Sequence, residues 1–414
     1  MHINTRVCDI ISSNVQSRVR NQKRYTFWGN MNYLTLSFLG FLAGLLVVYY
    51  LIPARYRYLV ILVGSYIFYG LGHPKMLITL VGLTAVSYIG GLIIEKKKSE
   101  VVFIASFTIE ILVLMVFKYT NFILGNVNTI LNKLGKSSTF NIEWSVLLPV
   151  GLSFIVFQTC SYLSEVYRGK IAAEKNFLRY AAFAAFFPTV LSGPIQKARN
   201  LLPQIKEPKA FDYEQAQKGT ILFAWGAFEK ILVANNLSII VSRILDDYKN
   251  HSSMEILIGA CCFSLYIYAD FNAYSDIARG VAKLLNIDVG RNFNNPYISK
   301  NTSEFWNRWH TSLNEWFIEN LYIPLGGNRK GTVRKYRNVL VVFLVSGLWH
   351  GEQWHFVIWG LFNGVLVVIG QILKHSGREE QAFLTSLAGL ILVLMWIIPY
   401  IYELFNTIKN LFEL

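Results

Sequence analysis

Long apolar segments follow one another along most of this chain, and they constrain its fold more than any other feature. A bilayer offers no water to satisfy exposed backbone groups, so repeated segments of this kind predict membrane helices. A full crossing needs about 20 residues, and several segments are shorter. We therefore expect an all-α polytopic membrane protein with roughly 10–12 transmembrane or re-entrant helices. The segments are 31–51, 58–71, 77–94, 101–124, 146–164, 177–194, 218–245, 254–269, 338–349, 354–373 and 383–404.

Charge content and charge placement support the same class. Charged residues make up 15% of the chain, against about 25% in soluble globular proteins. The net charge of +14 would ordinarily suggest nucleic acid as a partner. Here, however, Lys and Arg cluster in short turns between apolar segments, as they do in the cytoplasmic loops of membrane proteins. We expect the lipid bilayer, and no nucleic acid, as a partner.

The first 30 residues differ from the rest, because they are polar and basic and lack the apolar core of a signal peptide. Later basic clusters all fall on one face of the membrane if residue 31 starts outside, and the segment 1–30 would then lie on the wrong face. The hypothesis is that 1–30 is an extension that is not translated and that translation begins at Met31. Residues 31–414 are expected to form a single membrane domain. The clusters are Arg55 and Arg57, Lys96 to Lys98, and Arg168 with Lys170.

His350 ends an apolar run in the sequence SGLWHG, and the polar residues 351–353 follow it. This pattern predicts a short, broken or re-entrant helix that stops at membrane depth. An ionisable residue at that depth is costly and is a functional candidate. A neutral imidazole can accept a proton from a hydroxyl near pH 7. The alternative is a histidine that only hydrogen-bonds to a neighbouring helix.

His310 lies in FWNRWHTSLNEWF, which we read as one continuous helix. On such a helix Asn307, His310 and Asn314 share a stripe, which would suit the polar wall of a cavity. The alternative is an amphipathic helix that lies in the membrane interface and is anchored by its tryptophans. Trp309, Leu313 and Trp316 form the adjacent stripe, and Arg308, Ser312, Glu315 and Glu319 form a charged face.

A metal site is not expected. His350 and His355 are five residues apart and do not share a helix face, and no HExxH motif or carboxylate partner accompanies them. No cysteine pair shows CxxC spacing. Cys160, Cys261 and Cys262 lie in apolar surroundings and are expected to be small core residues.

Two further stretches combine polar residues with apolar runs. In Tyr266–Gly280, Asp276 and Arg279 are spaced to pair with each other, which favours a structural role over direct chemistry. In Phe186–Ile205, Pro188, Gly193 and Pro194 predict a helix break. Lys197 and Arg199 follow this break. They would suit either a phosphate-bearing donor at a cytoplasmic mouth or an ordinary positive-inside loop.

Six blocks, in one order, are similar to the membrane-bound O-acyltransferase (MBOAT) family, and to its alginate and peptidoglycan O-acetylation branch in particular. YIPLGGNRKG favours that branch over the related D-alanyl transfer proteins. Ala273 stands where the family usually has glycine, which would crowd a close helix approach. The blocks are LIPARYRYLVILVGSYIFYGLGHPK, LLPVGLSFIVFQTCSYLSEVYRG, FFPTVLSGPI, YADFNAYSDIARG, FWNRWHTSLNEWFIENLYIPLGGNRKG and VSGLWHGEQWHFVIWG.

The resemblance implies helices ringed around a central tunnel, where a thioester from the cytoplasm meets an acceptor from the other face. It implies that His350 is the catalytic base and His310 the second active-site histidine. Residues beside them are expected to contact substrate: Trp306, Asn307, Trp309, Asn314 and Trp349. The expected cofactor set is acetyl-CoA as donor, with nothing permanently bound.

The function that the resemblance implies is acetyl transfer in the bacterial plasma membrane. The acceptor would be an extracytoplasmic polysaccharide or peptidoglycan hydroxyl, reached directly or through a secreted acetyltransferase partner. Two alternatives stay open: D-alanyl transfer from a carrier protein to teichoic acid, and a non-enzymatic transporter. A transporter predicts internal repeats, and none is evident in the sequence.

Overall fold

The computed structural model describes residues 32–72, 74, 76–134 and 151–377, and within these ranges all regular secondary structure is helical. The expected all-α class is therefore confirmed. The proposed extension 1–30, the segment 383–404 and the first residues of the segment 146–164 lie outside the described residues. The main helices are α2 Leu36–Leu51, α3 Arg57–Gly72, α4 Met76–Lys97, α5 Glu100–Lys133, α6 Leu152–Tyr167, α7 Phe177–Ala184, α8 Phe187–Val190, α9 Ala198–Lys206, α10 Tyr213–Phe228, α11 Asn235–Leu245, α12 Ser253–Leu284, α13 Thr302–Arg308, α14 Thr311–Phe317, α15 Thr332–His350 and α16 Trp354–His375.

Within the described ranges, four helices are long and apolar enough to cross a membrane: α4, α5, α12 and α16. Their outward faces carry exposed apolar side chains, among them Ile104, Leu112, Leu265 and Ile369. A soluble protein rarely exposes so many large apolar groups together, whereas lipid tails accept them. The structure therefore fits a multi-pass membrane protein.

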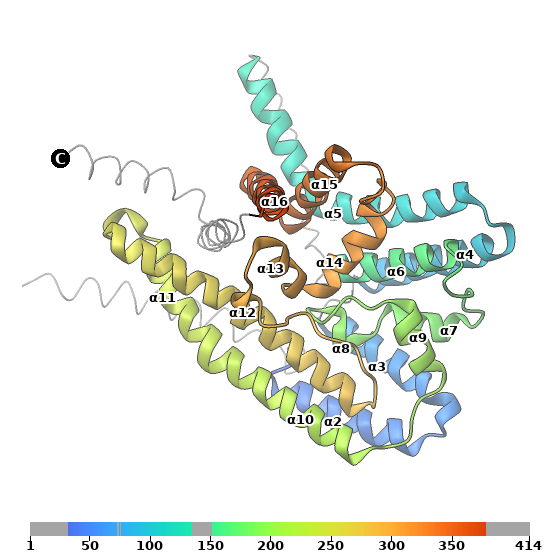
Figure 1. Ribbon diagram of the computed structural model, residues 1–414. Helices are drawn as coiled ribbons and strands as arrows, with labels where there is room; N and C mark the ends of the chain where they lie inside the picture. The colour runs from blue at the N-terminus through green and yellow to red at the C-terminus, as the bar shows by residue number, and fades with distance from the viewer. Residues whose placement is uncertain (1–31, 73, 75, 135–150, 378–414) are drawn as a thin grey trace, which may run out of the picture.

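The basic turns lie at one end of the molecule. The turns that follow α2, α4 and α6 are all on the right in Figure 1, whereas the start of α12 and the far end of α5 point the opposite way. The 34 residues of α5 correspond to about 51 Å of helix, which exceeds the roughly 30 Å of a hydrocarbon core. Its C-terminal part accordingly projects beyond the other helices in Figure 1.

The helix pair on the left of Figure 1 combines α12 with α10 and α11, which a π-helical segment, Glu229–Ala234, joins into one run. Small residues let the two partners approach closely. A Cβ atom added at Gly226 would lie 2.6 Å from the carbonyl oxygen of Ala273. The expected crowding by Ala273 is therefore absent, because Gly226 lies opposite and leaves the space.

Two apolar cores hold the rest together. The larger packs α2, α3 and α7 against the second half of α12, and the Tyr33 ring stacks on Phe68 with centroids 5.6 Å apart. The second core supports α14. There Trp316 stacks on Phe157 with centroids 4.0 Å apart and donates to its carbonyl oxygen at 2.8 Å.

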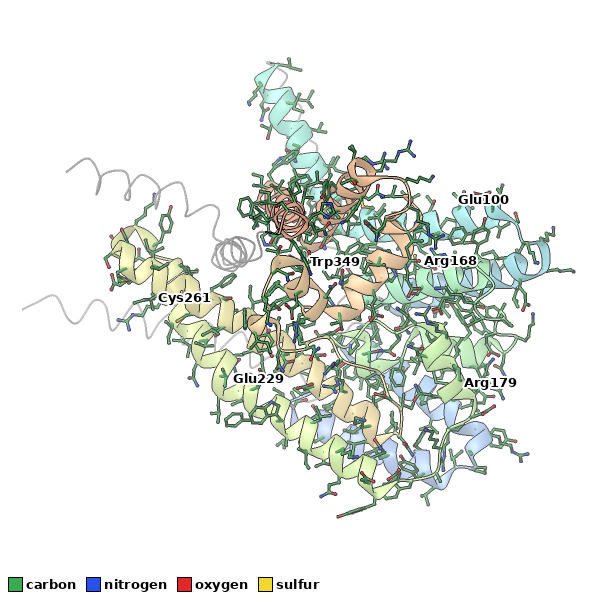
Figure 2. The ribbon with its side chains drawn as sticks, in the orientation of Figure 1. Glu100, Arg168, Arg179, Glu229, Cys261 and Trp349 are labelled. Carbon is green, nitrogen blue, oxygen red and sulfur yellow. The ribbon has the colours of Figure 1, made fainter. Side chains whose placement is uncertain are left out.

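Two local expectations need correction. The helix expected over 177–194 does not break at Pro188: α7 ends at Ala184, and Pro188 lies in the first turn of α8, where its missing N–H costs nothing. The break expected at Gly193 and Pro194 is confirmed, because α8 ends at Val190 and α9 begins at Ala198. Cys160 is buried as expected, but Cys261 is exposed. Cys261 is exposed because it lies on the outer part of α12 (Figure 2).

Candidate active site

His350 is the last residue of α15, and the chain leaves the helix at Gly351 in an extended conformation. A Cβ atom at residue 351 would overlap the Phe356 ring at 1.9 Å, so only glycine fits there. The predicted helix end is confirmed. The helix starts earlier than the predicted 338, because it includes the basic residues from Thr332 onward.

Close packing of α15 on α16 fixes the depth of His350. A Cβ atom at Gly347 would lie 2.3 Å from the carbonyl oxygen of Phe356, and one at Gly360 would lie 2.4 Å from that of Phe343. The two glycines face each other, so the helix backbones touch. This contact places His350 beside the buried Trp359, with ring centroids 4.9 Å apart.

His310 does not lie within a continuous helix, and the predicted single helix is wrong. The chain breaks between α13 and α14, and His310 has a φ of 45°. The loop before α13 causes the break by taking over the hydrogen bonds. Thr311 donates its N–H to the carbonyl oxygen of Asn292 at 2.8 Å, and Asn294 donates to that of Arg308 at 3.0 Å. A positive φ in a bulky residue is strained, and such strain concentrates at functional sites.

The break turns His310 into the interior rather than along an interfacial helix. Its side chain is almost fully buried, and its Nε2 atom has no hydrogen-bond partner among the described residues. The Phe271 ring stands edge-on against it at 4.6 Å between centroids. A buried polar atom without a partner is costly. It marks the place where a ligand atom would bind.

The structure brings the two histidines together at one aromatic cavity of about 590 Å³. Figure 2 shows Trp349 where α13, α15 and α16 meet. Trp306, Trp309 and Trp349, which the sequence placed beside the site, all line it. Its other walls come from α6, α12, α16, the turn after α8 and the short turn before α13: Phe154, Ser192, Phe263, Ser264, Ile267, Phe271, Tyr297 and Trp359.

A second, polar cavity of about 550 Å³ lies on the side of the basic turns, where Lys197 and Arg291 line it. Asn307 and Asn314 also line it, and the Asn314 amide donates to Asn307 Oδ1 at 3.2 Å. A narrow space of about 40 Å³ lies between the cavities. It shares Asn314 with the polar cavity and both histidines with the aromatic one.

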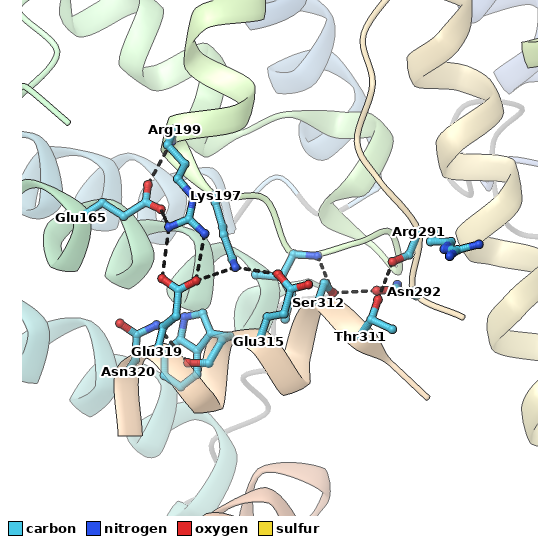
Figure 3. A network of polar contacts seen from close by, with 12 residues as sticks. Glu165, Lys197, Arg199, Arg291, Asn292, Thr311, Ser312, Glu315, Glu319 and Asn320 are labelled. Atoms are coloured by element: carbon cyan, nitrogen blue, oxygen red, sulfur yellow. Dashed lines mark hydrogen bonds and ion pairs between the residues drawn. The ribbon is translucent and has the colours of Figure 1, made fainter. Parts of the chain in front are cut away.

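An ion-pair network adjoins the polar cavity, which two of its members, Lys197 and Glu315, line (Figure 3). Glu319 accepts from Lys170 at 2.9 Å, from Lys197 at 2.7 Å and from Arg199 at 2.9 Å. Lys197 also pairs with Glu315 at 2.6 Å, and Arg199 with Glu165 at 2.9 Å. Lys197 is buried and is held by two carboxylates, so it is not an ordinary loop residue.

The network changes the acidity of its central carboxyl group. Burial alone would raise the pKa of Glu319, but hydrogen bonds from Arg199, Lys170 and Lys197 outweigh burial and hold its pKa well below the ordinary value. Glu319 therefore stays ionised through the physiological range. Glu319 lies in the segment after α14, and its ion pairs connect this segment to α9 and to the turn after α6.

The polar residues of α12 form a separate structural group. Arg279 pairs with Asp276 at 2.5 Å, as the spacing predicted. Asp270 pairs with Lys230 of the π-helical segment, and Asn272 donates to Glu229 at 2.8 Å. None of these side chains lines the cavities described above.

Sequence reasoning missed two residues at the site, Lys118 and Tyr119 of α5. The Lys118 ammonium donates to the carbonyl oxygen of Trp349, and the Tyr119 hydroxyl to that of Leu348. A signal was present, because a lysine inside an apolar span of membrane length is rare. Nothing in the sequence, however, showed that it faces the end of α15.

Comparison with known proteins identifies the family of this chain. The membrane-bound O-acyltransferase family, MBOAT, matches residues 95–407. A probable alginate O-acetylase AlgI of Pseudomonas putida is 34% identical over 346 residues, which cover 82% of this chain and 70% of that protein. The peptidoglycan O-acetyltransferase of Helicobacter pylori is 30% identical over 391 residues, covering 87% and 72%.

A more distant relative is the teichoic acid D-alanyltransferase of Bacillus subtilis. It is 26% identical over 247 residues, which cover 56% of this chain and 61% of that protein. The match of residues 95–407 and the identity to two O-acetylation proteins over most of the chain settle its class. The chain belongs to the membrane-bound O-acyltransferase family, and it is a multi-pass membrane acyltransferase.

Proposed function

We propose that this protein transfers an acetyl group from a cytoplasmic thioester to a hydroxyl on the other face of the bacterial plasma membrane. The acceptor class is an extracytoplasmic polysaccharide or peptidoglycan, or a partner transferase that serves one. The observation that carries the proposal is the position of His310 and His350. Both line the narrow space between a polar cavity on the basic side and an aromatic cavity on the opposite side.

The chemistry needs one base and one oxyanion donor. His350 takes the proton of the acceptor hydroxyl while the oxygen attacks the thioester carbonyl carbon. The C–S bond then breaks, and the imidazolium returns the proton to the leaving thiolate. His310 is placed to stabilise the oxyanion, because its buried Nε2 atom has no protein partner among the described residues and can donate to the acyl oxygen.

Acetyl-CoA is the donor that suits the polar cavity best. Arg291 lines that cavity together with Asn200, so its walls offer a cationic group and an amide to phosphate and amide oxygens. The narrow space beyond, at about 40 Å³, is of the size of an acetyl group. The names of the alginate and peptidoglycan relatives support acetyl over D-alanyl transfer, because their identity is higher and covers more of this chain.

The test uses a deletion strain complemented with variants, with O-acetyl groups measured on cell-wall and exopolysaccharide fractions. We expect His350→Ala to lower the O-acetyl content by about 10²-fold or more, because a positioned base contributes on the order of 10²–10⁴. The matched control is His375→Ala, an exposed histidine at the end of α16. Normal acetylation by a membrane-inserted His350→Ala protein contradicts the proposal.

His310 needs a different substitution, because its φ of 45° makes alanine a strained replacement. Glycine adopts this conformation freely and removes the ring. We expect His310→Gly to remain folded, because relief of the backbone strain offsets part of the cost of the cavity that the ring leaves, and to lose about 10²-fold in transfer rate. Wild-type activity in this variant removes His310 from the mechanism.

A further inference from the structure

Lys118 and Tyr119 are neighbours on the membrane-length helix α5 that both reach the C-terminal end of α15. Each donates a hydrogen bond to a backbone carbonyl there, Lys118 to Trp349 and Tyr119 to Leu348. The Lys118 ammonium also lies 5.5 Å from the centroid of the Trp349 ring. Among the described residues, no carboxylate forms an ion pair with it.

The carbonyls at this helix end need outside partners. The last four C=O groups of any α-helix have no partner within the helix. Many helices close on themselves through a left-handed glycine, but Gly351 is extended and provides no such closure. Lys118 and Tyr119 supply the missing donors, and the positive charge of Lys118 suits the negative end of the α15 dipole.

The same contacts fix the position of the next residue, His350. His350 comes directly after the two capped carbonyls, and the Trp349 ring stands edge-on to the imidazole with centroids 4.7 Å apart. Holding residues 348 and 349 therefore holds the imidazole toward the cavity. An ammonium is costly at membrane depth, and a purely structural cap would be made more cheaply by a neutral donor.

We propose that Lys118 is a positioning residue for acyl transfer: it fixes the end of α15 so that His350 faces the acceptor. The inference rests on the proposed function, in which His350 is the base. Tyr119 shares the hydrogen-bonding role and lacks the charge. The two residues therefore separate the effect of the hydrogen bond from the effect of the charge at the helix end.

The test uses purified full-length protein in detergent with radiolabelled acetyl-CoA and de-O-acetylated polysaccharide from the deletion strain. We expect Lys118→Met to lower kcat at least tenfold and to leave KM for acetyl-CoA within about twofold, because the base is misplaced while the donor cavity is unchanged. Lys118→Gln keeps a donor without the charge and is expected to lower kcat less than Lys118→Met does. Lys118→Arg keeps both the donor and the charge and is expected to lower kcat least. Tyr119→Phe removes one of the two donors and is also expected to lower kcat less than Lys118→Met does.

Two results overturn the inference. One is a wild-type kcat in Lys118→Met; the other is a loss of kcat in Lys118→Arg as large as that in Lys118→Met. His350→Ala is measured beside them. If it is inactive while the Lys118 variants are normal, only the positioning role fails; if it is active, the proposed function itself fails. Thermal unfolding of each variant reports whether it has folded.

Discussion

Glu319 is the residue on which the polar wall of the site depends, because it accepts from three cations on two other segments. Its side chain is 19% exposed, so its pairs are only partly screened by water. We expect Glu319→Gln to lower the free energy of unfolding by about 2 kcal/mol, because it leaves the buried Lys197 short of a partner. Thermal unfolding, followed by tryptophan fluorescence, measures the effect.

The matched control is Glu214→Gln. Glu214 pairs with Lys218 within α10, and both side chains are more than half exposed, at 71% and 53%. Exposed pairs of this spacing contribute about 0.5 kcal/mol or less. Equal destabilisation by the two variants contradicts the role given to Glu319.

The Glu319 network also predicts a pH dependence. Its pKa is lowered in the folded protein from an ordinary value of 4.5, so its contribution to stability is fully present above about pH 5 and is lost as pH falls through the folded pKa. The difference in unfolding free energy between wild type and Glu319→Gln should stay constant from pH 8 to about pH 5.5 and shrink below pH 4. A difference in unfolding free energy that grows toward low pH would contradict this prediction.

Sequence reasoning reached the two histidines and the side chains next to them in the chain, because their motifs are local. It did not reach Lys118, which acts on a backbone carbonyl 231 residues away. Contacts to backbone leave no pattern in the partner's side chains. A lone lysine in an apolar run shows only that some other group must offset the free energy of placing its charge in the membrane.

At the scale of helices, the α15–α16 pair is the element that places His350. Gly347 and Gly360 face each other, and a Cβ atom at Gly360 would lie 2.4 Å from a backbone oxygen that cannot move alone. We expect Gly360→Ala to separate the helices, to cost about 2 kcal/mol of stability and to reduce transfer activity. Thermal unfolding and acetyl transfer are measured together on the purified protein.

Gly125 in the projecting part of α5 is the control, because nothing lies within 4 Å of a Cβ atom built there. Gly125→Ala is expected to be neutral or to stabilise by up to about 1 kcal/mol, since alanine favours helix. Destabilisation by Gly125→Ala as large as that by Gly360→Ala would show that the close approach is not the cause.

The sequence predicted helix ends correctly where the residues that cause them are neighbours in the chain. Gly351 and the polar residues after it predicted the end of α15 correctly. The break at His310 was not predictable from periodicity, because FWNRWHTSLNEWF has a good helical pattern. The hydrogen bonds that break it come from Asn292 and Asn294, in the loop between α12 and α13.

At the scale of the whole molecule, the cavities are built from segments spread along most of the chain. The aromatic cavity takes walls from α6, α12, α13, α15 and α16, and the polar cavity takes walls from the segments before α9 and α13. Composition and apolar periodicity predict that these helices exist. They carry no information on which faces meet, so the enclosed site was expected only through family resemblance.

In the proposed function the two cavities are the route of the acyl group, and this route would account for the two buried histidines. The polar cavity adjoins the network that includes Lys170, in the basic turn after α6. The aromatic cavity reaches Phe263 in the first half of α12, which points to the other end of the molecule (Figure 1). The acyl group would pass the histidines between the two.

Sidedness of transfer in sealed proteoliposomes tests this most directly. Radiolabelled acetyl-CoA is supplied outside only, and the de-O-acetylated polysaccharide is enclosed in the lumen. We expect label on the lumenal acceptor with wild-type protein, and none with His350→Ala or with Ser346→Trp, which fills the narrow space that Ser346 lines. Label that appears only when donor and acceptor share one compartment would contradict transfer across the membrane through this site.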